Sequence, residues 1–597
     1  MMKINRIVPV LMLILLPSAV SGQRHIDIIR SDRAQEQISE KDYIVNLGYA
    51  LFAPERLPER YRPQDDRPIK CGTTIVANIQ RNLTLMTVPE QQFFAQYLSR
   101  PSFDILPESY VTPEGHFKIH YTVTHPPEIP EDHRVPLADT DQSGIPDFVE
   151  EAGRAFERSY RYEVDTLGYN PMPVDHVDGD EYDIFMKNVG PRLYGQTTGE
   201  TDNPETGWLD PTSYIVISKD FQGSGLYTKG VDGLRVTAAH ELHHAIQFGY
   251  IFRFNDSWFY EVTSTWLEDM VYPDVNDYLQ YMDDLFNQFD SPLTTSDGWH
   301  EYGMSIFAHF LSKAYHPDII RSVWEQLPFQ NAITTIAQVL DNQTTDGFKD
   351  ALHRFYVWNY YTGDRADPVN FYTDGAFFPE IEYEHVHGSG NDTTLTFNSL
   401  RLSAHYFRIL RDNPGAFILN AQGNPDELNI WRIGMLGSDS FIPSYDPQTA
   451  SIVFTDGYSG GAQLQMRGQF PEVIVAATNT AQSGITDLML DIRFDTLSVI
   501  TASALEATIP SPANFSERSS VIIPFSLDRP SSIEIQIYSI SGRLVKSFPP
   551  IHFGSEEAGS VEWNGTGDNG DAVSSGIYLC VMKGNGFTDM KKIAVIR

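Results

Sequence analysis

The stretch Val236-Thr-Ala-Ala-His240-Glu241-Leu-His-His244-Ala-Ile-Gln-Phe248 places a His-Glu-x-x-His pattern in an apolar segment with helical periodicity. Residues four positions apart lie on one face of a helix, so His240 and His244 can present their imidazoles to one metal ion. Glu241 lies beside them, where it can accept a proton from a metal-bound water. An ordinary buried helix with hydrogen-bonded histidines is the alternative, since chance matches are expected at a rate on the order of a few per cent.

A catalytic zinc ion needs a third protein ligand and one open position, and this helix supplies only two ligands. The next helix-like stretch is Trp258-Phe-Tyr-Glu261-Val-Thr-Ser-Thr-Trp266-Leu-Glu268-Asp269. Its first carboxylate, Glu261, follows His244 after sixteen intervening residues. Glu268 lies on the same helical face and is the competing ligand, or a residue that orients a ligand histidine.

These two segments resemble the gluzincins, the HExxH metallopeptidases whose third ligand is a Glu on a following helix, often in a Trp-x-x-Glu context. The resemblance implies Glu261 as the third zinc ligand. No third His follows as in the metzincins, which argues against that clan. The wider sequence, roughly Lys70 to Asp367, is similar to a largely uncharacterised family of secreted bacterial metalloproteases, most specifically around the two helices.

The resemblance implies hydrolysis of peptide bonds in a protein or peptide substrate by a zinc-activated water, with Glu241 as general base. Tyr302 is similar in placement to the Tyr that follows the zinc helices in gluzincin aminopeptidases, which implies an oxyanion donor; His300 is a second donor candidate. A core aromatic is an equally good interpretation of Tyr302.

Three functional classes therefore remain open. The Gly-x-Met-x-Asn segment by which gluzincin aminopeptidases hold a free amino terminus is missing upstream of His240, so an endopeptidase is favoured over an aminopeptidase. A surface binding protein or adhesin with a degenerate zincin domain is the alternative from another class. The intact base and ligand pattern favours the enzyme.

A second metal signal precedes the zinc helix. Residues 139–150, Asp-Thr-Asp-Gln-Ser-Gly-Ile-Pro-Asp-Phe-Val-Glu, follow the twelve-residue spacing of an EF-hand loop, with Gly144 at the turn. The predicted Ca²⁺ ligands are Asp139, Asp141, Ser143, Ile145 through its carbonyl, Asp147 and Glu150. Ser143 and Pro146 depart from the commonest form, and a solvated acidic turn is the alternative. We expect the ion to brace the domain and not to take part in the chemistry.

Changes in periodicity divide the chain into five parts. Residues 1–22 have a short basic region, an apolar run and small residues, as in a cleaved signal peptide. Residues 23–110 are predicted to be a propeptide-like leader, and residues 111–380 to be an α+β zincin-like domain. Short alternating strands then predict a β-sandwich over 381–500 and a second one over 501–597. The expected fold class is multidomain, an α+β catalytic domain followed by two β-sandwiches.

The last part resembles the Ig-like modules of exported bacterial proteins, including the flagellar hook-capping type and type IX secretion sorting domains. The matching text includes Ser541-Gly542-Arg543, Val561-Glu-Trp563-Asn-Gly565 and Ser575-Gly576-Ile577-Tyr578. The resemblance implies contact with secretion machinery or attachment to the cell surface. A plain stabilising sandwich is the alternative.

Charge and cysteine content limit the partners. The chain carries 79 acidic and 43 basic residues, a net charge of -36, which disfavours nucleic acid because a phosphate backbone would be repelled. No stretch after the signal peptide is long enough for a transmembrane span, so we expect a secreted or cell-surface protein.

Only two cysteines are present, Cys71 and Cys580, too few for a disulfide scaffold. Cys71 lies in a Cys-Gly pair of the leader. Some metalloprotease propeptides occupy the open zinc position with such a thiolate, and a small buried cysteine is the simpler interpretation.

Overall fold

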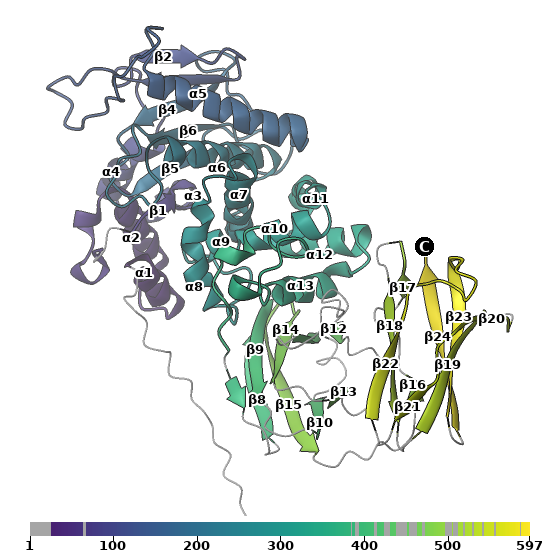
Figure 1. Cartoon of the computed structure of the whole chain (residues 1–597). Coiled ribbons are helices and arrows are strands. Elements are labelled where there is room, and N and C mark those ends of the chain that lie inside the picture. The colour runs from purple at the N-terminus through teal and green to yellow at the C-terminus, as the bar shows by residue number, and fades with distance from the viewer. Residues whose placement is uncertain are drawn as a thin grey trace, which may run out of the picture. The chain divides into compact units, whose positions relative to one another are not determined.

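The protein is described by a computed structural model covering residues 25–63, 67–383, 385–387, 393–410, 415–422, 430–436, 451–452, 462–468, 472–495, 504–505, 512–516, 520–527, 531–539, 542–553, 557–584 and 587–597. Two compact units are formed, one of Met1–Arg161 and Pro171–Phe254, the other of Tyr162–Asn170 and Asn255–Arg597. Mixed helices and sheets are followed by a β-rich C-terminal region, which confirms the multidomain α+β prediction at this level (Figure 1). The predicted signal peptide lies outside the described residues.

The first unit is built around one mixed sheet of six strands in the order β1-β5-β6-β4-β3-β2. The strands are β1 (Ile69–Cys71), β2 (Glu108–Val111), β3 (Phe117–Tyr121), β4 (Tyr182–Lys187), β5 (Leu193–Gly199) and β6 (Ser213–Ser218). The pairs β3–β4, β4–β6 and β1–β5 are parallel, whereas β5–β6 and β2–β3 are antiparallel. All of β6 is buried, as expected for a central strand covered on both faces.

Two long helices pack on each other and against this sheet. They are α5 (Asp147–Tyr160) and α6 (Gly230–Tyr250); α5 contacts β3, and α6 contacts β5 and β6. Every residue from 236 to 248 on α6 is buried, so this helix is enclosed on all sides although it carries His, Glu and Gln. Buried polar groups of this kind require compensating partners or ligands.

Four shorter helices come from the predicted leader: α1 (His25–Ala34), α2 (Glu40–Phe52), α3 (Thr73–Arg81) and α4 (Val88–Leu98). Their apolar side chains form one core, and this core includes Leu193 of β5. The leader also supplies β1, which pairs with β5 at Ile69↔Leu193 and Cys71↔Gly195. Residues of the leader are therefore part of the same sheet as the strands that follow it.

The second unit begins with helices and continues with strands. The helices are α7 (Ser257–Val271), α8 (Met282–Phe286), α9 (His300–Gly303), α10 (Ser305–Ala314), α11 (Asp318–Gln326), α12 (Ala332–Gln343) and α13 (Gly347–Trp358). Among the described residues, no helix has both the length and the apolar character needed to cross a membrane.

Two antiparallel-rich sheets follow, in the orders β13-β10-β15-β8 and β12-β11-β14-β9-β7. Their strands are β7 (His385–His387), β8 (Thr393–Leu400), β9 (Ser403–Leu410), β10 (Gly415–Gln422), β11 (Trp431–Leu436), β12 (Ser451–Ile452), β13 (Ala462–Gly468), β14 (Glu472–Asn479) and β15 (Ile485–Asp495).

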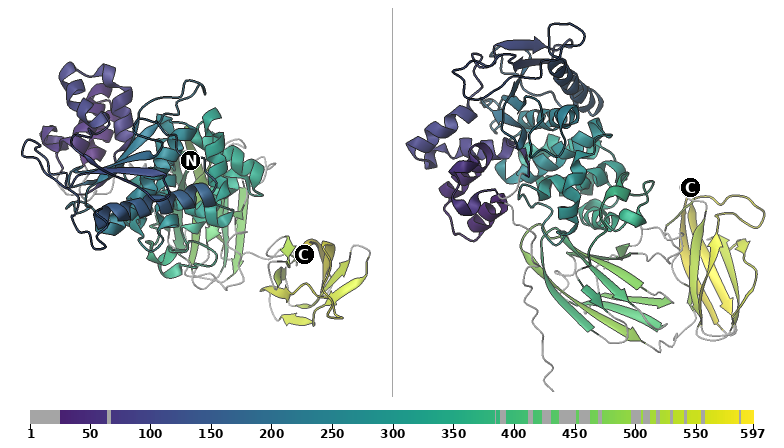
Figure 2. Two further views of the ribbon diagram at one scale, coloured as in Figure 1. Left: turned by 90° about the horizontal axis from the view of Figure 1, so that it is seen from above. Right: turned by 60° about the vertical axis from the view of Figure 1, so that its left-hand side comes forward.

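The C-terminal strands form the sheets β16-β18-β22 and β17-β24-β23-β19-β20, with β21 paired to β19 (Figure 2). They are β16 (Ala504–Leu505), β17 (Ala513–Asn514), β18 (Val521–Leu527), β19 (Ser531–Ser539), β20 (Leu544–Ser547), β21 (Ile551–Phe553), β22 (Glu557–Trp563), β23 (Gly576–Gly584) and β24 (Phe587–Ile596). One core joins the sheets, because Phe525 and Trp563 of the first pack with Ile535 and Ile593 of the second. Alternating burial along β19 is typical of a strand in a two-layered domain.

The sequence pattern predicts helices over Phe148–Val164, Val236–Phe248, Trp258–Met270 and Tyr302–Tyr315, and a strand over Ile452–Thr455. The segments predicted over Phe148–Val164, Val236–Phe248 and Trp258–Met270 lie in α5 and the following π-helical turn, α6 and α7, respectively. The helix predicted over Tyr302–Tyr315 is divided into α9 and α10 at Met304. The strand predicted over Ile452–Thr455 is described only at its first residue. The predicted boundaries at 110, 380 and 500 stay predictions.

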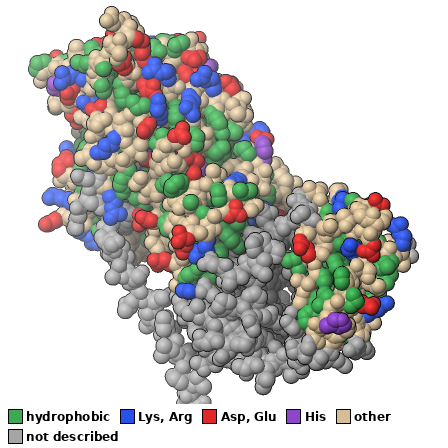
Figure 3. Space-filling model, viewed as in Figure 1, with side chains coloured by type: hydrophobic (Ala, Val, Ile, Leu, Met, Phe, Trp, Pro, Cys, Tyr) green, Lys and Arg blue, Asp and Glu red, His purple; other side chains and the backbone are tan. Residues whose placement is uncertain are grey.

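On the face shown in Figure 3, the Lys and Arg side chains of the described residues are scattered among acidic ones and form no continuous basic patch. Mixed charge of this kind is ordinary for a soluble surface.

Candidate metal centre

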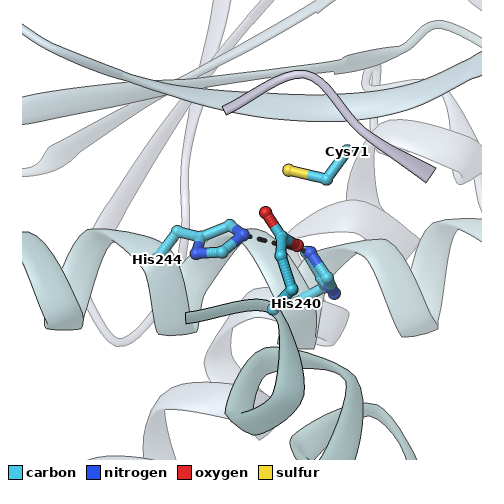
Figure 4. Close-up of side chains that lie close together, drawn as sticks. Cys71, His240 and His244 are labelled. Carbon is cyan, nitrogen blue, oxygen red and sulfur yellow. Dashed lines mark hydrogen bonds between the residues drawn. The ribbon is translucent and has the colours of Figure 1, made fainter. Parts of the chain in front are cut away.

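His240 and His244 meet on one face of the buried helix α6. Their Nε2 atoms are 3.1 Å apart, and the ring planes are nearly perpendicular, with centroids 4.7 Å apart. Two nitrogen ligands of a tetrahedral zinc ion would be separated by about 3.3 Å, given Zn–N bonds of about 2.05 Å. The pair therefore fits a zinc ion as two of its ligands (Figure 4).

Gln247 sets the tautomer of one imidazole. The His244 Nδ1–H donates to Gln247 Oε1 at 2.7 Å, since an amide oxygen can only accept. The Nε2 lone pair of His244 then remains available toward His240. Orientation of a ligand histidine through its second nitrogen is the usual arrangement in protein metal sites. Gln247 is fully buried, one helical turn beyond the motif, and the sequence analysis did not single it out.

Cys71 approaches the same point from β1. Its Sγ and the ring nitrogens of His240 and His244 lie within 4.8 Å of one another, and Figure 4 shows the thiol facing the two rings. Cys71 is 2% exposed and is not part of a disulfide. Strand pairing of Cys71 with Gly195 of β5 fixes its position over α6.

Glu241 is hydrogen-bonded through only one of its two carboxylate oxygens. The hydroxyls of Thr197 and Thr73 donate to Oε2 at 2.8 and 3.2 Å, while Oε1 is buried and has no hydrogen-bond partner among the described residues. A buried carboxylate oxygen without a partner is costly and needs an explanation. A bound water or substrate group at Oε1 would provide one.

Glycine at position 195 brings β5 close to α6. A Cβ at Gly195 would lie 3.0 Å from the Thr237 methyl and 3.2 Å from Glu241 Cγ. Any larger residue would push the strand away from the helix. The same strand residue pairs with Cys71 and lies close to Glu241, so β5 helps to set the separation between the thiol and the base.

A third histidine lies on the same helix. Burial, with the neighbouring His244 and His240, holds the pKa of His243 well below its usual range. His243 is therefore neutral at physiological pH.

The remaining predicted zinc-site residues lie in the second unit. Glu261 and Glu268 are both buried on α7, and His300 and Tyr302 are buried on α9. The Tyr302 ring packs 5.2 Å from the Tyr281 ring, and burial lowers the pKa of His300 to about 4. The choice of Glu261 over Glu268 as third ligand, and of Tyr302 over His300 as oxyanion donor, stays a prediction.

The predicted calcium loop gathers three of its carboxylates. Oxygens of Asp139, Asp141 and Asp147 lie within 4.8 Å of one another. The backbone N–H of Ser143 donates to Asp139 at 3.0 Å, and Gly144 has the positive φ of 87° that the turn requires. The loop thus resembles a cation-binding loop in geometry as well as in spacing.

Other predicted loop ligands have protein partners. Ser143 Oγ donates to the Ile145 carbonyl at 3.2 Å, and Glu150, on α5, lies 3.7 Å from Arg154. Glu150 does not belong to the group formed by the three aspartates, and its role as a ligand stays a prediction.

One further cluster was not predicted. His120 of β3 lies 2.8 Å from Asp183 of β4 and 3.9 Å from Asp178, and these three residues also lie within 4.8 Å of one another. Arg100 pairs with Asp183, and Lys118 with Asp178 at 2.6 Å. No local spacing links these residues, so the sequence alone carries no signal for them.

The chain matches no known family profile, and no curated protein matches it. Among solved structures, dimeric latent PorU from Porphyromonas gingivalis is 20% identical over 21% of this chain and 14% of its own, with a TM-score of 0.15. PorZ, a surface component of the type IX secretion system of the same organism, is 22% identical over 18% of this chain and 14% of its own, with a TM-score of 0.13.

The CARDB domain of the PF1109 protein from Pyrococcus furiosus is 14% identical over 17% of this chain and 99% of its own, with a TM-score of 0.13. The matched segment spans about a seventh of PorU and of PorZ. Similarity at this level assigns neither a fold nor a function to the chain.

Proposed function

We propose that the protein is a secreted zinc-dependent endopeptidase whose metal ligands are His240, His244 and Glu261. The observation that carries the proposal is the convergence of the two Nε2 atoms, 3.1 Å apart, on the helix that also carries Glu241, whose buried Oε1 has no hydrogen-bond partner among the described residues. Glu268 is the alternative third ligand. This donor set of two imidazoles and a carboxylate suits zinc and leaves a position for substrate.

Zinc bound by these residues would lower the pKa of a water molecule to about 7 and polarise the scissile carbonyl. Glu241 would take the proton at Oε1 and pass it to the leaving amine. Thr197 and Thr73 support this role, because their hydrogen bonds hold Oε2 and leave Oε1 without a partner among the described residues. Gln247 orients His244 so that its Nε2 faces the ion.

The oxyanion of the tetrahedral intermediate needs a further hydrogen-bond donor. We assign this role to Tyr302, with His300 as the alternative. The missing amino-terminus clamp of the gluzincin aminopeptidases favours cleavage within a chain over removal of terminal residues.

Calcium bound at residues 139–150 would stabilise the fold. The loop immediately precedes α5, and α5 packs against α6. An ion shared by Asp139, Asp141 and Asp147 would relieve the repulsion of their carboxylates and fix the start of α5. Extracellular calcium is abundant enough to fill even a weak site of this type.

The C-terminal module, residues 501–597, is assigned to export or cell-surface attachment. Its sequence resemblance to sorting modules and its all-β architecture support this role. Secretion of the full chain, compared with that of a chain ending at residue 500, tests it; equal secretion and equal surface retention would contradict the assignment.

The enzymatic proposal is tested with purified chain, zinc analysis and casein as substrate. Wild type should bind about one zinc ion per chain, and wild type freed of residues 23–110 should cleave casein and lose this activity with a chelator. Glu241→Gln should retain zinc and lose activity by about 10²- to 10⁴-fold. Zinc-loaded wild type that leaves casein and a range of unfolded proteins intact, with and without its leader, would contradict the proposal.

A further inference from the structure

The leader brings a sulfur atom to the candidate zinc site. Cys71 Sγ lies within 4.8 Å of the His240 and His244 nitrogens, and Cys71 belongs to β1, within residues 23–110. The only other cysteine in the sequence is Cys580, and the structure forms no disulfide between the two. Cys71 therefore keeps a thiol, which can bind zinc once it is deprotonated.

We propose that Cys71 is an additional zinc ligand that fills the position needed by substrate, so that the leader keeps the enzyme inactive until it is removed. This inference rests on the proposed zinc peptidase function. Zinc with two histidines, one carboxylate and a thiolate is a closed, four-coordinate site, whereas catalysis needs an open position. On binding, the thiol proton is released to solvent and the sulfur lone pair forms the bond to zinc.

The thiol is positioned by a network that also holds the general base. Cys71 Sγ lies 3.0 Å from Thr73 Oγ1, and the Thr73 N–H donates to Sγ at 3.3 Å. Thr73 Oγ1 in turn accepts from the Thr197 N–H at 2.8 Å and lies 3.2 Å from Glu241 Oε2. Two residues of the leader, Cys71 and Thr73, thus lie at the site. A cysteine that only fills space in a core would not need this hydrogen-bond network.

The strand that carries Cys71 also covers a pairing edge. In the sheet order, β1 lies outside β5, and the N–H groups of Ile69 and Gly72 donate to the carbonyls of Arg192 and Gly195 at 2.9 and 3.0 Å. Extended peptides commonly bind proteins by adding a strand to such an edge. Since a Cβ at Gly195 would lie 3.2 Å from Glu241 Cγ, an extended substrate on the edge of β5 would pass close to the base. The leader therefore competes with substrate for both the metal and the strand.

Strand β1 cannot leave the edge of β5 by side-chain motion alone. Leu193 of β5 packs in the core formed by the leader helices, and Arg192 Nη2 donates to the Ala50 carbonyl at 3.2 Å. Gln80 donates to the Gly199 carbonyl at 3.0 Å at the other end of the strand. These contacts span the whole length of β5 and hold β1 in place. We therefore expect β1 to leave the sheet only after the leader has been cut.

The ligand is tested by zinc X-ray absorption on the uncut chain. Measurement in a Glu241→Gln background prevents self-cleavage while keeping the metal. The Glu241→Gln chain should show zinc–sulfur scattering at about 2.3 Å, which the Glu241→Gln, Cys71→Ser chain should lack. The matched control, Cys580→Ser in the same background, should keep it, because Cys580 lies in β23 and burial raises the pKa of its thiol to about 12. Absence of zinc–sulfur scattering from the first chain would overturn the proposal.

Inhibition is tested in the active background. Uncut Cys71→Ser and Cys71→Ala chains, with the leader verified as intact by mass, should cleave casein at least about tenfold faster than uncut wild type, and Cys580→Ser should not. Thermal melting confirms that each variant is folded. If uncut Cys71 variants remain as inactive as wild type while wild type freed of its leader is active, Cys71 is not the inhibitor. If leader removal leaves the wild type inert although zinc–sulfur scattering is present, the peptidase function fails and Cys71 stands as a ligand of a structural zinc site.

Discussion

His240 and His244 on α6 can be set beside His120 and Asp183 on β3 and β4, two buried groups in one unit that are built from ordinary metal-ligand residues. Both groups satisfy the same proximity limit of 4.8 Å. The two groups differ in whether a Lys or Arg side chain compensates the buried carboxylate beside the histidines. Arg100 forms an ion pair with Asp183, whereas no Lys or Arg of the described chain pairs with Glu241 in the first group.

The difference shows that proximity of His and carboxylate side chains does not by itself make a metal site. In the second group a guanidinium already compensates the buried carboxylate, so a cation would have to displace Arg100. In the first group the two histidine nitrogens face each other, and no Lys or Arg of the described residues would have to be displaced, so a cation can bind between them. We therefore expect zinc at the first group alone.

The largest effect expected from this comparison is loss of metal at the first group. His244→Ala should lower bound zinc from about one ion per chain to nearly zero and abolish casein cleavage, because one of two helix ligands is removed. Plasma emission analysis after gel filtration measures the metal. His243→Asn, on the same helix, is the control and should retain zinc; full zinc in His244→Ala would place the ion elsewhere.

Removal of the Arg100 guanidinium from the second group should lower the stability of the protein. Arg100→Leu leaves Asp183 buried without its cation and should lower the free energy of unfolding by about 3–5 kcal/mol, with bound zinc unchanged. Arg154→Leu, whose side chain is 61% exposed and pairs with Glu151, should cost less than about 1 kcal/mol. Urea unfolding compares the two. Equal costs would mean that burial does not distinguish these ion pairs.

Calcium should stabilise the first unit through the loop at 139–150. At a free calcium concentration a hundredfold above Kd, ligand linkage stabilises the folded state by about 2.7 kcal/mol, which calorimetry detects as a rise in Tm. Asp139→Ala should remove this rise. Asp180→Asn changes an acidic residue that is 93% exposed and lies outside the loop, so it should keep the rise; a calcium response in Asp139→Ala would contradict the site.

The smallest effect concerns the orientation of His244. Gln247→Leu removes the acceptor of the Nδ1–H and should weaken zinc binding by about 10- to 100-fold, while occupancy at saturating zinc stays complete. Competition with a chromogenic chelator gives the affinity. Unchanged affinity would show that Gln247 does not set the tautomer used for binding.

The parts of the site that the sequence predicted are local in sequence. His240, Glu241 and His244 lie within one helical turn, and the calcium loop holds its carboxylates within twelve residues. For such patterns the secondary structure alone determines the geometry. The long buried helix α6 was predicted for the same reason, since its apolar periodicity is strong.

The unpredicted parts depend on contacts between distant segments. Thr73 and Thr197 meet Glu241 only because β1 pairs with β5 in one register, and β-strand register is a property of the folded sheet. The helices α1 to α3 escaped prediction because they are short and gain stability mainly from their shared core. Glu261 and Tyr302 belong to the second unit, and their roles still rest on the resemblance.

The pairing of β1 with β5 also bears on how the chain folds. The two strands are more than a hundred residues apart in sequence, so their pairing is a slow, non-local event that must precede any cut in the leader. If the leader is removed as proposed, a chain that unfolds can no longer form this pairing or rebuild the core around Leu193. The folded state of the mature protein would then be maintained by a high barrier to unfolding. Its lifetime outside the cell would depend on the unfolding rate and not on the equilibrium free energy of unfolding.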